Sequence, residues 1–148
     1  MECLDLQKYI AQCIDQNNCL HLPVIPGYGL SVVPVIWAKA TKWDGTIIYV
    51  IPKAIHTQMA HEIMKMTGHK AKFLVGMTQE MPLFPRVLIV TPQTLRFRVD
   101  ELCHVGPRFV VAYNIKTRWD DVRKLCKEAE RVCLLGGEST INTRRILG

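Results

Sequence analysis

The sequence predicts one α/β domain with a mostly parallel central sheet and helices on both of its faces. The first observation is that short apolar runs alternate along the 148 residues with amphipathic segments of about three helical turns. The second is that the runs at 45–51, 86–91 and 108–113 are almost continuously apolar, as expected of strands covered on both faces. No linker, repeat or low-complexity segment divides the chain, so residues 1–148 are expected to form a single domain.

The first third of the chain is expected to fold as helix, strand, helix and strand. Residues 1–18 are predicted to contain an N-terminal helix, because apolar side chains recur on one helical stripe at Cys3, Leu6, Ile10, Cys13 and Ile14. A short strand is expected over 19–25. The next helix is expected over 31–41, with Pro34 near its first turn, where a missing N–H is tolerated. It leads into the strand at 45–51.

The middle of the chain repeats this alternation. A helix is expected over 52–68, with inward side chains at Ile55, Met59, Ile63 and Met66. Strands are expected over 70–76 and 86–91, joined by a loop. The segment 92–103 predicts a helix that begins with Pro92. Its Leu95, Val99 and Leu102 side chains are expected to face the core.

The last third is expected to add two strands to the sheet. A helix is predicted over 118–130, capped by Thr117, because Asp120 and Asp121 suit the positive end of a helix. The other elements expected here are strands at 108–113 and 131–135 and a closing helix at 139–147.

The charge balance indicates an acidic partner. The formal net charge is +6, and nucleic acid is the most common partner of a basic domain. The N-terminus has no continuous apolar core and no stretch is long and apolar enough to cross a bilayer, so we expect no signal peptide, no membrane segment and a cytoplasmic location. The six cysteines show no tight framework and are expected to be reduced.

A glycine-containing loop precedes the second predicted helix. It comprises Gly27, Tyr28, Gly29, Leu30 and Ser31, and we call it the phosphate-loop remnant. Backbone N–H groups in such a loop bind phosphate, and a serine hydroxyl there can hold magnesium. Leu30 stands where a phosphate loop carries lysine, and it offers neither a charge nor a hydrogen-bond donor.

Three segments in order resemble motifs of superfamily 2 helicases, especially the DExH group and its flavivirus-type relatives. "VIPGYGLSVVPVI" resembles the first motif, with Pro34 three residues after Ser31. "IIYVIPKAIHTQMAHEI" resembles motif Ia through Pro52 and Lys53, and "RVLIVTPQTL" resembles motif Ib from Thr91 onward. The resemblance covers about residues 19–140 and implies a RecA-like lobe, one of the two that such helicases possess. The flavivirus-type features suggest a viral replication protein or polyprotein as a source.

The departures from the family concern its ATPase residues. The family's Asp-Glu pair, which holds magnesium and activates water, would fall at Ala112, Tyr113 and Asn114. The Ser-Ala-Thr motif has no clear match near "LLGGESTI", and the second lobe with its arginine finger is not in this sequence. We therefore expect a domain without ATPase activity, with no catalytic residue, no metal and no cofactor. ATP and magnesium are expected only if the chain is instead a divergent active NTPase.

The resemblance also implies nucleic-acid contacts. In the family, motifs Ia and Ib touch the backbone of a single strand, which positions that strand without reading its sequence. The matching candidates here are Lys53, Thr91, Gln93, Arg96 and Arg98. The alternative is that the basic residues among them are ordinary solvated charges.

The remaining candidates for metal binding or base stacking are cysteine, histidine, methionine and tryptophan residues, and most of them are expected to have structural roles. Cys19 with His21, and Cys103 with His104, lack the paired spacing of a metal site and are expected to be structural. We expect His56 and His61 to be surface residues and Met59, Met64 and Met66 to fill the core or a groove. Among the tryptophans, Trp37 is expected in the core, whereas Trp43 and Trp119 are candidates for base stacking.

Three functions remain open from the sequence. The first is a catalytically inactive helicase-like domain that binds single-stranded RNA, a protein partner or a second helicase lobe as a scaffold. The second is a divergent but active NTPase or RNA helicase lobe. The third is an unrelated α/β protein-interaction domain whose glycines only form a turn.

Overall fold

The computed structural model describes residues 3–16, 18–22, 31–76, 80–82, 85–113 and 119–135. Six strands form one sheet in the order β1-β6-β5-β2-β4-β3, and every neighbouring pair is parallel. The strands are β1 (Cys19–Leu22), β2 (Thr46–Val50), β3 (Lys72–Leu74), β4 (Val87–Val90), β5 (Arg108–Tyr113) and β6 (Arg131–Leu135). The predicted α/β class with a parallel sheet is confirmed.

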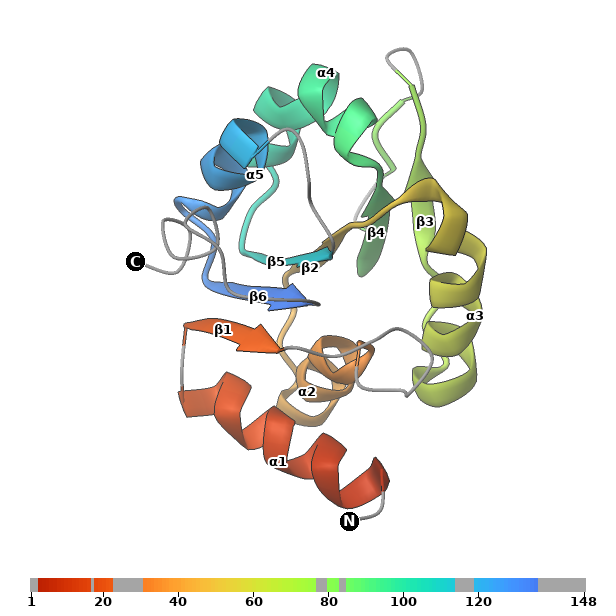
Figure 1. The fold of residues 1–148 in the computed structure, drawn as a ribbon, viewed down its shortest axis with the longest axis vertical. Helices are drawn as coiled ribbons and strands as arrows, with labels where there is room; N and C mark the ends of the chain where they lie inside the picture. The colour runs from red at the N-terminus through yellow and green to blue at the C-terminus, as the bar shows by residue number, and fades with distance from the viewer. Residues whose placement is uncertain are drawn as a thin grey trace.

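Helices cover both faces of this sheet (Figure 1). They are α1 (Cys3–Gln16), α2 (Val33–Thr41), α3 (His56–Thr67), α4 (Pro92–Cys103) and α5 (Trp119–Cys126). Side chains alternate along a strand, so Ile47 and Tyr49 of β2 join the core under α1, α2 and α3, whereas Ile48 and Val50 join the core under α4 and α5. Two separate apolar layers therefore hold the helices to the sheet.

The region 52–68 is not one continuous helix. A 3₁₀ turn, η1 (Lys53–Ile55), precedes α3. Pro52 has extended backbone angles and its carbonyl accepts from the Ile55 N–H at 3.1 Å, which is the tighter hydrogen-bond spacing of a 3₁₀ turn. The buried face of α3 consequently comprises His56, Met59, Ile63 and Thr67. The prediction that Met66 points inward is wrong, and Met64 is exposed as well.

Other boundaries follow the sequence closely, with one clear exception. The structure confirms 92–103 as a helix and 108–113 and 131–135 as strands. The helix predicted to reach residue 130 ends at Cys126, because the Glu130 N–H already donates to the Arg108 carbonyl at 3.0 Å and draws the chain into β6. The predicted Thr117 cap and the closing helix at 139–147 lie outside the described residues.

An aromatic cluster closes the core on the α1–α2 face. Trp37 is buried, as predicted, and its ring lies 5.9 Å from that of Trp43 and 5.7 Å from that of Phe109. The Arg131 guanidinium lies over Trp37, 4.8 Å from the ring centroid, and donates to the Ile14 carbonyl of α1. In the part of the chain that the structure describes, no helix is long and apolar enough to cross a membrane.

Candidate nucleic-acid interface

The strands that carry the motif Ia-like and motif Ib-like segments are direct neighbours in the sheet. Val50 at the end of β2 pairs with Val90 at the end of β4, and the Ile51 N–H extends the ladder by donating to the Val90 carbonyl at 3.1 Å. Lys53 in η1 and Gln93 in the first turn of α4 therefore leave the same edge of the sheet, and both are exposed. We call this the carboxyl edge, which is the end of a parallel sheet where ligands bind.

Thr91 joins β4 to α4 and caps the helix. Its hydroxyl oxygen accepts from the Thr94 backbone N–H at 3.0 Å, and Pro92 occupies the first turn, where no N–H is needed. The Thr91 side chain is half-buried, and its hydroxyl hydrogen is still able to donate to an acceptor outside. The positive end of α4 thus lies at the carboxyl edge.

Arg98 has a different position from the other predicted contacts. Its side chain is 3% exposed, and its guanidinium forms an ion pair with Glu101, with Nε 3.0 Å from Oε1. It also donates to the Gly76 carbonyl at 3.2 Å, while the Gly76 N–H donates to Thr94 Oγ1 at 3.4 Å. Arg98 therefore holds the turn after β3 against α4, and direct contact with a strand of nucleic acid would require it to leave these bonds.

Arg96 lies on the outer surface of α4. Gln93, Arg96 and Phe97 share one helix face because they are spaced three and four residues apart. The Arg96 guanidinium lies 5.5 Å from the centroid of the Phe97 ring, and Phe97 is 54% exposed. The motifs in the sequence do not include Phe97, although its position outside the buried series of α4 marks it as an exposed aromatic that can stack on a base.

The prediction that His56 is a surface residue is wrong. Because α3 begins after η1, His56 joins its buried face, where Nε2 lies 2.9 Å from the Ile51 carbonyl oxygen. The imidazole stacks on Phe73 of β3, with centroids 5.8 Å apart. Burial lowers the pKa of His56, and the Lys53 charge lowers it further. His56 therefore packs against the backbone just after β2. His61 is exposed, as predicted.

Of the phosphate-loop remnant, Gly27, Tyr28, Gly29 and Leu30 lie outside the described residues. Ser31 is 1% exposed, and its carbonyl accepts from the Tyr49 hydroxyl at 2.7 Å. Burial raises the pKa of Tyr49. The Ser31 hydroxyl is also buried and has no hydrogen-bond partner among the described residues.

The described residues at the end of β5, where the family carries its acidic pair, supply no carboxylate for a magnesium–ATP complex. At the end of β5, Ala112 is buried and apolar and Tyr113 is half-buried, while Asn114 lies outside the described residues. Asp120 and Asp121 are in the first turn of α5, as expected of helix-start residues, and Asp120 pairs with Arg123 at 3.4 Å. A lone serine hydroxyl does not supply the charges that a metal–phosphate complex needs.

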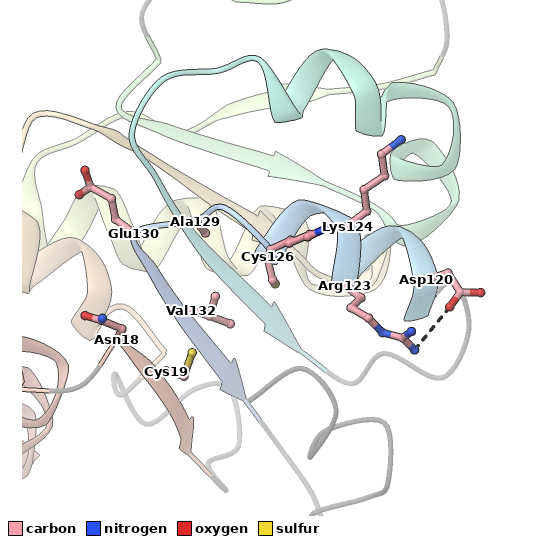
Figure 2. Close-up of a pocket in the computed structure, with 10 residues that line it drawn as sticks. Asn18, Cys19, Asp120, Arg123, Lys124, Cys126, Ala129, Glu130 and Val132 are labelled. Carbon is pink, nitrogen blue, oxygen red and sulfur yellow. Dashed lines mark ion pairs between the residues drawn. The ribbon is translucent and has the colours of Figure 1, made fainter. Parts of the chain in front are cut away.

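A cleft of about 650 Å³ lies elsewhere, between α5 and the starts of β1 and β6. Figure 2 shows α5 along one side and β1 along the other, with Val132 of β6 between them. Charged groups of both signs line it, including the Asp120–Arg123 pair. Cys126 also lines it, and burial raises the pKa of this thiol to about 12, so it is a weak metal ligand. Among the described side chains, no group of three potential metal ligands occurs.

Comparison with known proteins shows similarity in structure only. No protein-family model matches the chain, and comparison with curated protein sequences gives no match. The chain aligns with the SWI2/SNF2 ATPase core of Sulfolobus solfataricus, solved in complex with double-stranded DNA, with a TM-score of 0.74 and 14% identity over 99% of this chain and 35% of that one. A structure of the same core domain gives a TM-score of 0.75 and 14% identity over 91% of this chain and 30% of that one.

The helicase domain of Pyrococcus furiosus Hef is also similar, with a TM-score of 0.66 and 17% identity over 95% of this chain and 35% of that one. This chain spans about a third of the length of these proteins. Similarity at such low identity establishes the fold alone, and that fold is the RecA-like α/β fold that the sequence predicted.

Proposed function

We propose that this chain is a helicase-like domain that binds single-stranded RNA along its carboxyl edge and does not hydrolyse ATP. The observation that carries the proposal is the adjacency of β2 and β4, which brings the segments with the motif Ia-like Lys53 and the motif Ib-like Gln93 to the same edge of the sheet. Arg96 and Phe97 extend the same exposed surface along α4. A cation, an amide, a helix N-terminus and an exposed ring are the groups that bind a nucleic-acid backbone and stack its bases.

Two of the five predicted contacts, Thr91 and Arg98, mainly support the protein structure around the RNA path in this proposal. The Thr91 side chain caps α4 and offers one hydroxyl hydrogen, and Arg98 fixes the turn after β3 from inside the protein. Lys53, Gln93 and Arg96 are the direct contacts. The net charge of +6 supports this assignment because backbone binding depends on positive charge.

Replacing Lys53 with alanine should weaken binding of a single-stranded RNA about fivefold, which corresponds to about 1 kcal/mol for one exposed charge contact. The slope of log K against log salt should also decrease in magnitude by roughly 0.7, because one fewer cation is released from a single strand. Fluorescence anisotropy over a series of salt concentrations measures both quantities.

Lys127 is the matched control, since it is exposed and follows α5 at the opposite end of the sheet. Lys127→Ala should leave the affinity within about twofold of the parent, as expected for a charge remote from the strand. Equal losses in the two variants would show that only net charge matters. Binding that does not respond to salt would contradict an RNA path at the carboxyl edge.

ATP hydrolysis should not exceed the rate without protein, either alone or with single-stranded RNA. Loss of the loop lysine removes a charge-assisted bond worth roughly 1.5–3 kcal/mol in binding, and loss of the carboxylates removes the magnesium ligands. Phosphate release in the presence of magnesium measures this. A Leu30→Lys variant should remain inactive because Ala112 and Tyr113 still provide no carboxylate. Micromolar binding of a fluorescent ATP analogue together with turnover would favour the divergent NTPase instead.

A protein scaffold is the second candidate function. Phe73 of the edge strand β3 and Val75, which follows that strand, have exposed side chains. Exposed apolar side chains at the edge of a sheet can contact a partner protein or a second lobe. If the protein does not bind RNA at low salt, a protein-scaffold function explains the exposed apolar residues near β3 better than an RNA-binding function does.

A further inference from the structure

A small basic pocket lies at the end of the sheet opposite the carboxyl edge. It has a volume of about 240 Å³ and is lined by Ala38, Lys39, Lys42, Trp43, His69 and Arg86. These residues come from the end of α2, from the turn between α3 and β3, and from the position before β4. Because each of these segments precedes a strand, the pocket lies at the amino ends of the strands. We call it the basic pocket.

The basic pocket concentrates positive charge. Lys39, Lys42 and Arg86 carry three cations, and the described residues that line the pocket include no carboxylate. The Lys39 ammonium donates to the Thr67 carbonyl at 2.7 Å, and Arg86 donates to the carbonyls of Trp43 and, at 3.3 Å, Gly45. Carbonyl partners hold the Lys39 and Arg86 side chains in place, and neither side chain forms an ion pair with a described carboxylate. Each cation also has further N–H groups to donate.

The pKa of His69 responds to the positive charges of the basic pocket. Its pKa is lowered from the ordinary value, first by burial and then by the charges of Arg86 and Lys39. Two cations from different segments therefore act on the same imidazole. This is the potential that an anion in the pocket would offset.

Lys42 has an unusual backbone conformation at the rim. Its φ of 57° is left-handed, and it is the one non-glycine residue with positive φ in the part of the chain that the structure describes. It ends α2, where glycine is the favoured residue, and lysine costs roughly 1 kcal/mol more in this conformation. The exposed ammonium of Lys42 is thus added to the pocket at a position where glycine would suit the backbone better.

We propose that the basic pocket binds a phosphate group. Two lysines and an arginine supply charge-assisted hydrogen bonds, and the half-buried Trp43 ring provides a flat apolar wall for whatever carries the phosphate. The ligand class comprises free phosphate, a nucleoside monophosphate and the backbone of a strand. The site is separate from the carboxyl edge and does not depend on the RNA path proposed there.

The first test is an NMR titration of the histidine ring protons with inorganic phosphate, with His69 assigned through a His69→Gln variant. The His69 resonance should move saturably, and its pKa should be higher in phosphate than in chloride, because a bound anion favours the imidazolium. His61 is exposed on α3 and away from the lining residues, so its resonance is the internal control. A shift of both histidines in proportion, without saturation, would overturn the proposal.

The second test uses Lys42→Gly, which removes a charge and gives the end of α2 its favoured residue. The variant should be at least as stable as the parent in urea, yet bind phosphate about fivefold more weakly, as expected for the loss of one exposed charge contact. Lys127→Ala and Lys53→Ala should both keep the parent phosphate affinity. Unchanged affinity in Lys42→Gly, or equal losses in all three variants, would overturn the site.

The source of the phosphate is distinguished by competition. A nucleoside monophosphate, the matching nucleoside and a single-stranded oligonucleotide are each added at saturating phosphate, and the His69 resonance is followed. Displacement by the monophosphate alone identifies a small-molecule site, and displacement by the oligonucleotide identifies a second backbone contact. Displacement by the unphosphorylated nucleoside as strongly as by the monophosphate would contradict phosphate recognition.

Discussion

Replacing Arg108 with methionine should lower the free energy of unfolding by about 3 kcal/mol. Arg108 begins β5 and is buried beneath α4 and α5. Its Nε donates to the Leu125 carbonyl at 2.9 Å, and one terminal nitrogen donates to the Cys103 carbonyl at 3.1 Å. These carbonyls belong to the last turns of α5 and α4, where carbonyls lack partners within the helix and the helix dipole is negative.

Methionine is chosen because it keeps most of the side-chain volume. The expected loss then arises from two carbonyls left without their donor, each costing about 1–3 kcal/mol if buried, rather than from a cavity. Removal of the buried cation recovers part of that cost, because a buried charge is unfavourable unless it is well bonded. Urea unfolding followed by circular dichroism measures the net change.

Arg123 of α5 provides the matched control. Its side chain is 43% exposed and pairs with Asp120, which is 94% exposed. Arg123→Met should change stability by less than about 0.5 kcal/mol, as is usual for surface ion pairs. If Arg108→Met cost less than the control, Arg108 would not be the residue that joins the two helix ends to the sheet.

The second large effect concerns alkaline pH. Cys133 lies in β6 with no exposed surface, and burial raises the pKa of its thiol from an ordinary 9.0 to about 12. The folded chain therefore holds this proton more tightly than the unfolded chain does. The resulting stability is fully present below pH 9, and it is lost progressively as the pH rises from 9 toward 12.

Between pH 8 and pH 10.5, one such thiol should account for a loss of about 2 kcal/mol. Cys133→Ala should remove that share of the pH dependence, even though the cavity that it creates lowers stability at every pH. Urea unfolding at several pH values measures the two curves. Some alkaline loss of stability should remain in both the parent and Cys133→Ala. It comes from Cys126, whose pKa burial also raises to about 12, and from Tyr49, whose pKa burial raises as well.

Cys19 is the control for this experiment because its side chain is exposed in β1. Cys19→Ala should retain the steep alkaline loss of the parent. Parallel pH curves for the parent and Cys133→Ala would show that folding does not raise the pKa of the Cys133 thiol.

Two surfaces at opposite ends of one sheet now have separate assignments. The carboxyl edge combines Lys53, Gln93 and Arg96 beside the positive end of α4 and is proposed to bind single-stranded RNA. The amino end combines Lys42 and its neighbours in a pocket proposed to bind phosphate. Lys53→Ala, which tests the carboxyl edge, is a control for the basic pocket, so either proposal can fail without the other.

Local sequence was sufficient to predict the kind and order of the elements. Pro92 followed by Leu95, Val99 and Leu102 predicted α4 with its observed boundaries, because helix start signals and apolar spacing act within a few residues. The apolar runs of β2, β4 and β5 predicted strands buried on both faces for the same reason. The motif resemblance added the RecA-like lobe and the choice of Lys53, Thr91 and Gln93.

Tertiary structure decided which residues meet. The pairing of β2 with β4 brings the segments that carry Lys53 and Gln93 to the same edge of the sheet, and the contact of α4 with the turn after β3 takes Arg98 inside the protein. Two separate segments also bring together the cations of the basic pocket, next to His69 of a third, and no spacing in the sequence marked them. Strand order and helix packing depend on contacts between residues far apart in the chain, whereas periodicity and caps record only the neighbours of each residue.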